Sequence, residues 1–150
     1  MSRFAGSVEE FDTYIVPITS EQKAWQEGLK TVEALHSLGV TADKIHLLPN
    51  RIQDDPKEEI PAAFNYVKQQ KKAQISPDVF LFESEMYAYL AKKKMSFDTL
   101  IGEGTDYRAL AKAEADPEKA KEYARMYRWT RAAIPVRNNL DETFKGLMGA

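Results

Sequence analysis

Asn50 and Arg51 are the residues of this chain whose types and position most favour ligand binding. They follow the apolar run at residues 45–48, and open α/β sheets bind ligands at the carboxyl ends of their parallel strands. An asparagine amide can read an adenine edge through its paired donor and acceptor, and an arginine can stack on a base or bind phosphate. Asparagine is also an ordinary turn former, and arginine is commonly a solvated surface residue. From position alone we favour these plain roles, and the ligand hypothesis stays open.

A second candidate surface is basic. Four cations recur at spacings of three and four residues: Lys121, Arg125, Arg128 and Arg131. Most stripes of this kind are the solvent face of an amphipathic helix. Clustered arginines are also what a contact to a DNA backbone or to an acidic partner requires. The stripe is therefore retained as a candidate contact surface.

No motif for catalysis or metal binding accompanies these residues. His36 and His46 are the only histidines, and neither has a second histidine or an acidic cluster at ligand spacing. The chain has no cysteine, which excludes a disulfide framework and a cysteine nucleophile. The sequence also contains no nucleophile elbow and no Gly-x-x-x-x-Gly-Lys-[Ser/Thr] phosphate loop. We therefore expect no bound metal, and the sequence alone offers no catalytic constellation.

Two strands joined by a helix are predicted to position the candidate ligand residues. Residues 13–18 and 45–48 are rich in β-branched and aliphatic side chains, and the residues between them have a helical pattern. Strands connected in this way lie parallel, so the fold class is α/β with helices on both faces of a parallel sheet. Ile15 and Val16 are predicted core residues, and Pro17 is expected to end its strand.

The connecting helix has recognisable ends. Thr19 and Gln22 are spaced as a capping box, and Gly39 is predicted to provide the left-handed residue after the last turn. Gly28 is expected to allow a close approach between the helix and the sheet. The predicted apolar face contains Trp25, Gly28, Leu29, Val32, Leu35 and His36.

Further elements are predicted before residue 94. Pro61 would break a helix already under way, so a helix is expected over residues 61–70. A third short buried strand is predicted over residues 79–82, and a helix over residues 85–93 follows it. This repeats the alternation of strand and helix that is typical of a parallel sheet.

The sequence is helical in pattern from residue 96 onward. Asp116 and Pro117 are predicted to begin a long helix, Pro135 to interrupt it, and a last helix to follow from Leu140. We expect residues 1–150 to form one α/β domain, with strand-helix units over residues 1–94 and a helical carboxyl-terminal part over residues 95–150.

Composition limits the class of protein further. The 150 residues are 43% hydrophobic, which is enough for a substantial core, and the formal net charge is −2. That charge gives no overall attraction for nucleic acid, so any such contact would need a local patch. No apolar run approaches the roughly 20 residues needed to cross a bilayer. We expect a cytoplasmic protein without a membrane span.

Three segments of the chain together resemble the ParA/MinD family of deviant Walker-type ATPases. They read Phe11-Asp12-x-x-Ile15-Val16-Pro17-x-Thr19, then Leu35-x-x-Leu38-Gly39-Val40, then Lys44-Ile45-x-Leu47-x-x-Asn50-Arg51. The ending resembles the plasmid-stability (StbB-type) branch, through Phe97-Asp98-x-Leu100-Ile101, Asp106-Tyr107-Arg108 and Pro135-Val136-Arg137-Asn138-Asn139-Leu140-Asp141. The resemblance covers nearly the whole chain but implies only the carboxyl-terminal half of the family's P-loop NTPase fold.

The resemblance assigns roles to residues one by one. It implies that Asn50 contacts adenine with Arg51 beside it, and that Glu83 and Ser84 lie near the segment that closes over the base. The family's phosphate loop, signature lysine, magnesium-binding Ser/Thr and water-positioning Asp have no counterpart in this chain. ATP and Mg²⁺ are thus the implied cofactors of the complete family proteins. Neither is expected to bind tightly to this chain alone, which is not expected to hydrolyse ATP.

The resemblance also implies partners. In complete family members, ATP binding brings two protomers together and the dimer binds DNA without sequence preference. A homo-oligomer is therefore expected here, with nonspecific DNA and a DNA-binding adaptor protein as further partners. The stripe from Lys121 to Arg131 becomes the implied DNA surface.

Three functions follow as hypotheses. The first is a fragment of a ParA-like ATPase that acts in plasmid partition, plasmid stability or conjugative transfer, whose half sheet would expose an apolar edge. The alternative is a non-enzymatic protein-interaction module on the same scaffold. A third is an unrelated small α/β enzyme with its site around Thr19, Asn50 and Glu83.

Overall fold

The computed structural model describes residues 11–102 and 104–149. These residues divide into two compact units, one formed by residues 11–83 and 141–149 and the other by residues 84–140. The boundary after residue 83 lies earlier than the predicted change at residues 94–95, and the end of the chain belongs to the first unit. The described fold is mixed α/β, mostly helical, with a two-stranded parallel sheet.

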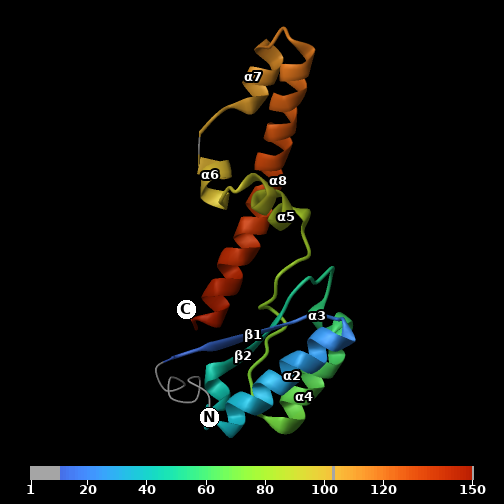
Figure 1. Ribbon diagram of the computed structural model, residues 1–150, viewed down its shortest axis with the longest axis vertical. Helices are drawn as coiled ribbons and strands as arrows, with labels where there is room; N and C mark the ends of the chain where they lie inside the picture. The colour runs from blue at the N-terminus through green and yellow to red at the C-terminus, as the bar shows by residue number, and fades with distance from the viewer. Residues whose placement is uncertain (1–10, 103, 150) are drawn as a thin grey trace. The chain divides into compact units, whose positions relative to one another are not determined.

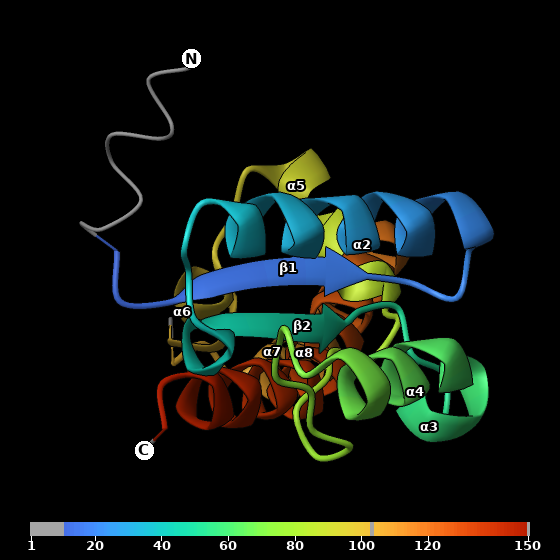
Figure 2. The same cartoon turned by 90° about the horizontal axis from the view of Figure 1, so that it is seen from below.

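A parallel pair of strands forms the centre of the first unit. Strand β1 (Tyr14–Ile18) pairs with β2 (Ile45–Pro49), in a register that runs from Tyr14 opposite Ile45 to Ile18 opposite Pro49. Helix α2 (Gln22–Ser37) and the 3-10 turn η2 (Ala42–Lys44) connect the two strands. Figure 2 shows α2 lying along the strands. The predicted parallel crossover is confirmed.

Strand β1 buries only one of its two faces. Val16 and Ile18 are buried, whereas Ile15 is 41% exposed, so the prediction that Ile15 lies in the core is wrong. The Asn50 N–H donates to the Ile18 carbonyl at 2.8 Å, which means that alternate residues of β1 direct their backbone groups toward β2. Pro17 lies between those residues, where its missing N–H would point away from β2. This position explains why a proline is tolerated inside the strand rather than at its end.

Helix α2 approaches the sheet at Gly28. A Cβ atom on Gly28 would lie 2.5 Å from Cγ2 of Ile18, so the predicted close approach is confirmed. Val32 and Leu35 are buried on the same side of the helix, but His36 is exposed and does not belong to the apolar face.

The prediction for α2 is confirmed at its carboxyl end and wrong at its amino end. Gly39 has φ +89, and the Val40 N–H donates to the Leu35 carbonyl at 3.1 Å, as in a Schellman motif. The predicted capping box is wrong, because the helix begins at Gln22 and the Thr19 hydroxyl instead accepts a hydrogen bond from the Glu21 N–H at 3.2 Å. Thr19 thus shapes the turn before the helix.

The predicted third strand over residues 79–82 is not formed. Two isolated parallel bridges join this part of the chain to β2 and its extension, one pairing His46 with Gln74 and the other Ile52 with Phe82. A turn at residues 77–78 separates them, and Pro77 has no N–H to donate to a ladder. Phe82 is also exposed, so the segment is an interrupted, half-buried neighbour of β2.

Two short helices follow β2. Asp55 caps α3 (Pro56–Glu59) by accepting a hydrogen bond from the Lys57 N–H at 2.9 Å. Helix α4 (Pro61–Gln70) has the predicted bounds. Its Tyr66 ring contacts the Trp25 ring of α2 edge to face, with 6.1 Å between centroids. Helices α2 and α4 therefore pack against each other.

A polar cluster joins the same two helices. The Tyr66 hydroxyl donates to one carboxylate oxygen of Glu33, and the Lys72 ammonium donates to the other at 2.8 Å. Burial, and then the hydrogen bond to Glu33, raises the pKa of Tyr66 above its usual 10.0. The hydrogen bonds from Lys72 and Tyr66 lower the pKa of Glu33.

The Tyr66 hydroxyl predicts a pH-dependent contribution to stability. Because the folded-state pKa is raised, this contribution is complete below about pH 10 and is lost as pH rises through the folded value. Tyr66→Phe should lower the free energy of unfolding by about 1 kcal/mol at neutral pH and remove this alkaline loss. Urea unfolding at a series of alkaline pH values measures both effects. Parallel curves for the two proteins above about pH 10 would contradict the assignment.

The second unit is helical, and its first helix was well predicted. Helix α5 (Glu85–Lys93) has the expected bounds, and α6 (Phe97–Gly102) and α7 (Tyr107–Ala113) follow it. The buried core of the unit consists of Met86, Leu90, Leu100 and Ala133. The Tyr89 and Trp129 rings stack beside it with centroids 4.0 Å apart.

Helix α8 (Pro117–Leu147) contributes residues to both units. Asp116 caps its start by accepting a hydrogen bond from the Glu118 N–H at 3.1 Å, as predicted. The helix continues through Pro135, so the predicted interruption and the separate last helix from Leu140 are both wrong. None of the helices in the described ranges combines the length and apolar character that a bilayer crossing requires.

Candidate functional site

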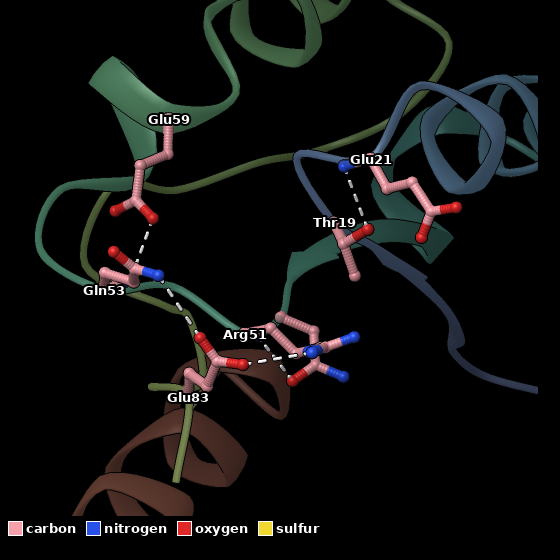
Figure 3. A network of polar contacts seen from close by, with 7 residues as sticks. Thr19, Glu21, Arg51, Gln53, Glu59 and Glu83 are labelled. Atoms are coloured by element: carbon pink, nitrogen blue, oxygen red, sulfur yellow. Dashed lines mark hydrogen bonds and ion pairs between the residues drawn. The ribbon is translucent and has the colours of Figure 1, made fainter.

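A polar cleft lies at the carboxyl ends of β1 and β2. We call it the strand-end cleft; it has a volume of about 370 Å³. Its side chains come from the turn after β1, the loop after β2, helix α3 and the segment before α5 (Figure 3). The lining residues are Thr19, Ser20, Glu21, Arg51, Gln53, Glu59 and Glu83.

Arg51 and Glu83 form the ion pair of this cleft. Arg51 Nη2 donates to Glu83 Oε1 at 3.0 Å, which brings together two of the residues singled out in the sequence. The Arg51 backbone has φ +57, a left-handed conformation that is uncommon for a non-glycine residue and often found at ligand sites. The backbone of Arg51 is therefore strained. Its side chain is held by the ion pair with Glu83 (Figure 3).

Asn50 shapes the turn that places Arg51. Its N–H continues the hydrogen-bonding of β2 to Ile18, and its Oδ1 accepts the Arg51 N–H at 2.9 Å. This is the turn-forming role that the residue type favours. Asn50 itself does not line the strand-end cleft. Its amide nitrogen has no hydrogen-bond partner among the described residues, so a donor remains for a ligand beside the cleft.

Glu83 is a charged acceptor. Its Oε1 is bonded by Arg51, and its Oε2 accepts from Gln53 Nε2 at 3.4 Å. The hydrogen bond from Arg51, and then that from Gln53, lowers the pKa of the Glu83 carboxyl. The carboxylate is thus ionised at neutral pH.

Glu59 holds the loop that carries the other cleft residues. Its two carboxylate oxygens accept the backbone N–H groups of Gln53 and Asp54, each at 2.9 Å. Sequence reasoning missed both Gln53 and Glu59 as site residues. The only signal was their place between the strand-end residue Arg51 and the capped turn at Asp55, which indicates a loop but not where its side chains point.

The charge of the cleft limits what it can bind. The lining side chains include three carboxylates, from Glu21, Glu59 and Glu83, and one guanidinium, from Arg51, so their net charge is −2. Such a lining repels a phosphate group. It suits ligands that donate hydrogen bonds, such as hydroxyl and amino groups.

The other predicted site residues lie outside this cleft. Ser84 belongs to the second unit, where its Oγ caps α5 by accepting the Met86 N–H at 3.1 Å. Of the basic stripe, Lys121 pairs with Glu118 at 3.7 Å, and Arg131 donates to the Tyr127 hydroxyl at 3.2 Å. The stripe's exposed position on α8 agrees with the predicted amphipathic helix.

Arg125 and Arg128 complete that stripe. Both side chains are exposed, and neither forms an ion pair or hydrogen bond with any described residue. They are thus the two cations of the stripe that have no partner among the described residues.

Metal binding has no support in the described ranges. Residues 11–102 and 104–149 contain no group of three or more His, Asp or Glu side chains that could hold a metal ion. No family model, no curated protein and no solved structure matches the chain.

Proposed function

We propose that this chain is the scaffold portion of a ParA/MinD-type ATPase that acts in plasmid partition, plasmid stability or conjugative transfer. In this proposal the strand-end cleft receives the nucleoside end of an adenine nucleotide. The observation that carries it is the Arg51–Glu83 ion pair, which lies beside Asn50 at the carboxyl end of β2. This is the position at which open parallel sheets bind ligands.

The chemistry of the cleft supports a nucleoside rather than a triphosphate. Carboxylates such as Glu83 accept hydrogen bonds from ribose hydroxyls or an adenine amino group, and the Asn50 amide nitrogen can donate to a ring nitrogen. The Arg51 guanidinium plane can stack on a base. The lining does not fit the triphosphate, because its net negative charge repels phosphate. We propose no hydrolytic step in this cleft.

Adenosine binding tests this proposal. We expect weak binding, with Kd of about 1 mM or higher, and backbone amide shifts confined to residues 50–53, 83 and the turn after β1. Asn50→Ala should weaken binding about fivefold, because one hydrogen bond is lost. Asn65→Ala, an exposed asparagine on α4, is the matched control and should leave binding unchanged. An NMR titration in which the amide signals of residues 50–53 and 83 do not shift would contradict the proposal.

A non-enzymatic interaction module is the second candidate. It is favoured by the hydrogen bonds that the cleft residues make among themselves. Arg51 bonds to Glu83, and Glu59 bonds to the backbone of the loop before it, without any ligand. In that case a homo-oligomer or a DNA-binding adaptor would be the partner, and adenosine would have no effect. Sedimentation velocity over a range of concentrations tests self-association, and a constant sedimentation coefficient would remove the homo-oligomer.

We further propose that the stripe on α8 contacts DNA without sequence preference, because Arg125 and Arg128 are unpaired among the described residues. Replacing both by glutamine should reduce the slope of log K against log salt by about 2, since each phosphate contact contributes roughly 0.9. Lys30→Gln, at an exposed position on α2, is the control. Fluorescence anisotropy with a labelled duplex measures the slopes, and equal slopes for all three proteins would contradict the proposal.

A further inference from the structure

Helices α7 and α8 form a shallow groove within the second unit that is open to solvent. Residues 114–116 connect the two helices, and a connection this short makes them antiparallel neighbours. Figure 1 shows α7 beside the first turns of α8. The groove between them, which we call the α7–α8 groove, has a volume of about 380 Å³. Its lining residues are Arg108, Ala111, Lys112, Ala120, Lys121, Ala124 and Tyr127.

The fold holds this groove open. Asp106 caps α7 by accepting the Ala109 N–H at 3.0 Å, and the Tyr107 and Tyr123 rings pack with centroids 6.4 Å apart. The ring contact sets the spacing of the two helices at one end, and the Asp106 cap fixes the start of α7. The three alanines that line the groove are too small to fill the space between the helices, so an apolar hollow remains. The hollow is shallow and open, so it suits side chains of a docked helix rather than a fully buried small molecule.

The charged residues of the groove all have the same sign. Arg108 and Lys112 lie one helical turn apart on α7, and Lys121 lies on α8. Lys121 contacts Glu118 at 3.7 Å, but both side chains are exposed and such pairs are weak. Arg108 and Lys112 have no ion pair with any described residue. No carboxylate lines the groove.

We propose that the α7–α8 groove binds an acidic amphipathic helix from a partner protein. Apolar side chains of that helix would occupy the alanine floor, and its carboxylates would pair with Arg108, Lys112 and Lys121. An apolar floor with a cationic rim is complementary to this combination, as in other helix-in-groove complexes. A nucleic acid would use the rim but gain nothing from the floor. The inference depends only on this groove and is independent of the nucleoside proposal.

A designed peptide provides the probe. It is a fluorescein-labelled helix with leucines spaced three and four residues apart on one face and glutamates elsewhere, and its binding to the full chain is followed by anisotropy. Ala124→Trp, which fills the groove, should weaken binding at least about tenfold. The double variant Arg108→Glu with Lys112→Glu should have a similar effect through charge reversal. Lys30→Glu changes an exposed cation of α2 that does not line the groove, and it should change binding less than about twofold.

The outcomes separate the alternatives. Circular dichroism establishes whether each variant is folded. If Ala124→Trp does not fold, the charge-reversal variant still tests the proposal. Equal binding by wild type and both groove variants overturns the proposal. So does equal binding of a peptide with lysines in place of glutamates. If Ala124→Trp instead abolishes self-association of the chain while the acidic peptide does not bind, the groove serves a second copy and the acidic-partner proposal is wrong.

Discussion

Replacing Ile18 by alanine is expected to lower the free energy of unfolding of the first unit by about 2–5 kcal/mol. The Ile18 side chain is fully buried at the end of β1, and its Cγ2 atom lies 2.5 Å from the position that a Cβ on Gly28 would take. Gly28 has no side chain with which to fill the space that the substitution leaves. The cavity would thus persist between strand and helix, and its cost would add to the lost burial.

Hydrogen exchange provides the measurement, because it reports the free energy of opening for each unit separately. The amides of Leu47 and Asn50, which bond to neighbouring segments, should lose protection in Ile18→Ala. Ile15→Ala is the matched control on the exposed face of the same strand, and it should cost less than about 1 kcal/mol. Equal losses in the two variants would contradict the observed burial of β1 on one face.

Pro135→Ala is expected to have the second large effect, with the opposite sign. Proline in a helix interior costs about 3 kcal/mol relative to alanine, because it removes one N–H and crowds the preceding turn. In α8 the missing donor faces the carbonyl of Arg131, four residues earlier. Pro135 itself is exposed, so alanine restores the hydrogen bond without leaving a cavity. Thermal unfolding should shift to higher temperature.

Asn138→Ala is the control for that experiment. Asn138 is an exposed position of the same helix, and the substitution should add less than about 0.7 kcal/mol through helix propensity alone. A Pro135→Ala protein that is no more stable than Asn138→Ala would show that the proline is not strained in α8.

Local signals predicted the parts of the fold that depend on local interactions. The helix at Pro61–Gln70 begins with a proline at its first position, and Glu85–Lys93 follows a serine cap. The close approach at Gly28 also followed from one residue type on an apolar face. In each case the residue acts within its own helix or against the strand that immediately precedes it.

Long-range packing decided the elements that the sequence pattern did not. Pro135 predicts a helix break, yet the helix continues through it. Ala133 before the proline and Thr143 after it are both buried, each in its own packed unit. The apolar run at residues 79–82 predicts a strand, but after the turn at residues 77–78 it joins the extension of β2 through an isolated bridge between Ile52 and Phe82. These outcomes depend on contacts between residues distant in the sequence.

In the candidate site, too, local features could be predicted and long-range contacts could not. The position of Asn50 and Arg51 after β2 could be predicted, because it needs only one strand and its direction. The contact of Arg51 with Glu83 joins residues 32 positions apart, and the place of Glu83 depends on the interrupted segment beside β2. The support from Glu59 depends on how the loop before α3 folds, for which the sequence has no strong pattern.

A comparison of adenosine with ATP tests the central claim most directly. The strand-end cleft carries two net negative charges on its lining side chains, so we predict that adenosine binds this chain at least as tightly as ATP with Mg²⁺. The measurement is a pair of NMR titrations followed at the amides of residues 50–53 and 83. ATP binding about tenfold tighter than adenosine, with shifts at those amides, would show that the cleft receives phosphates and would contradict the account.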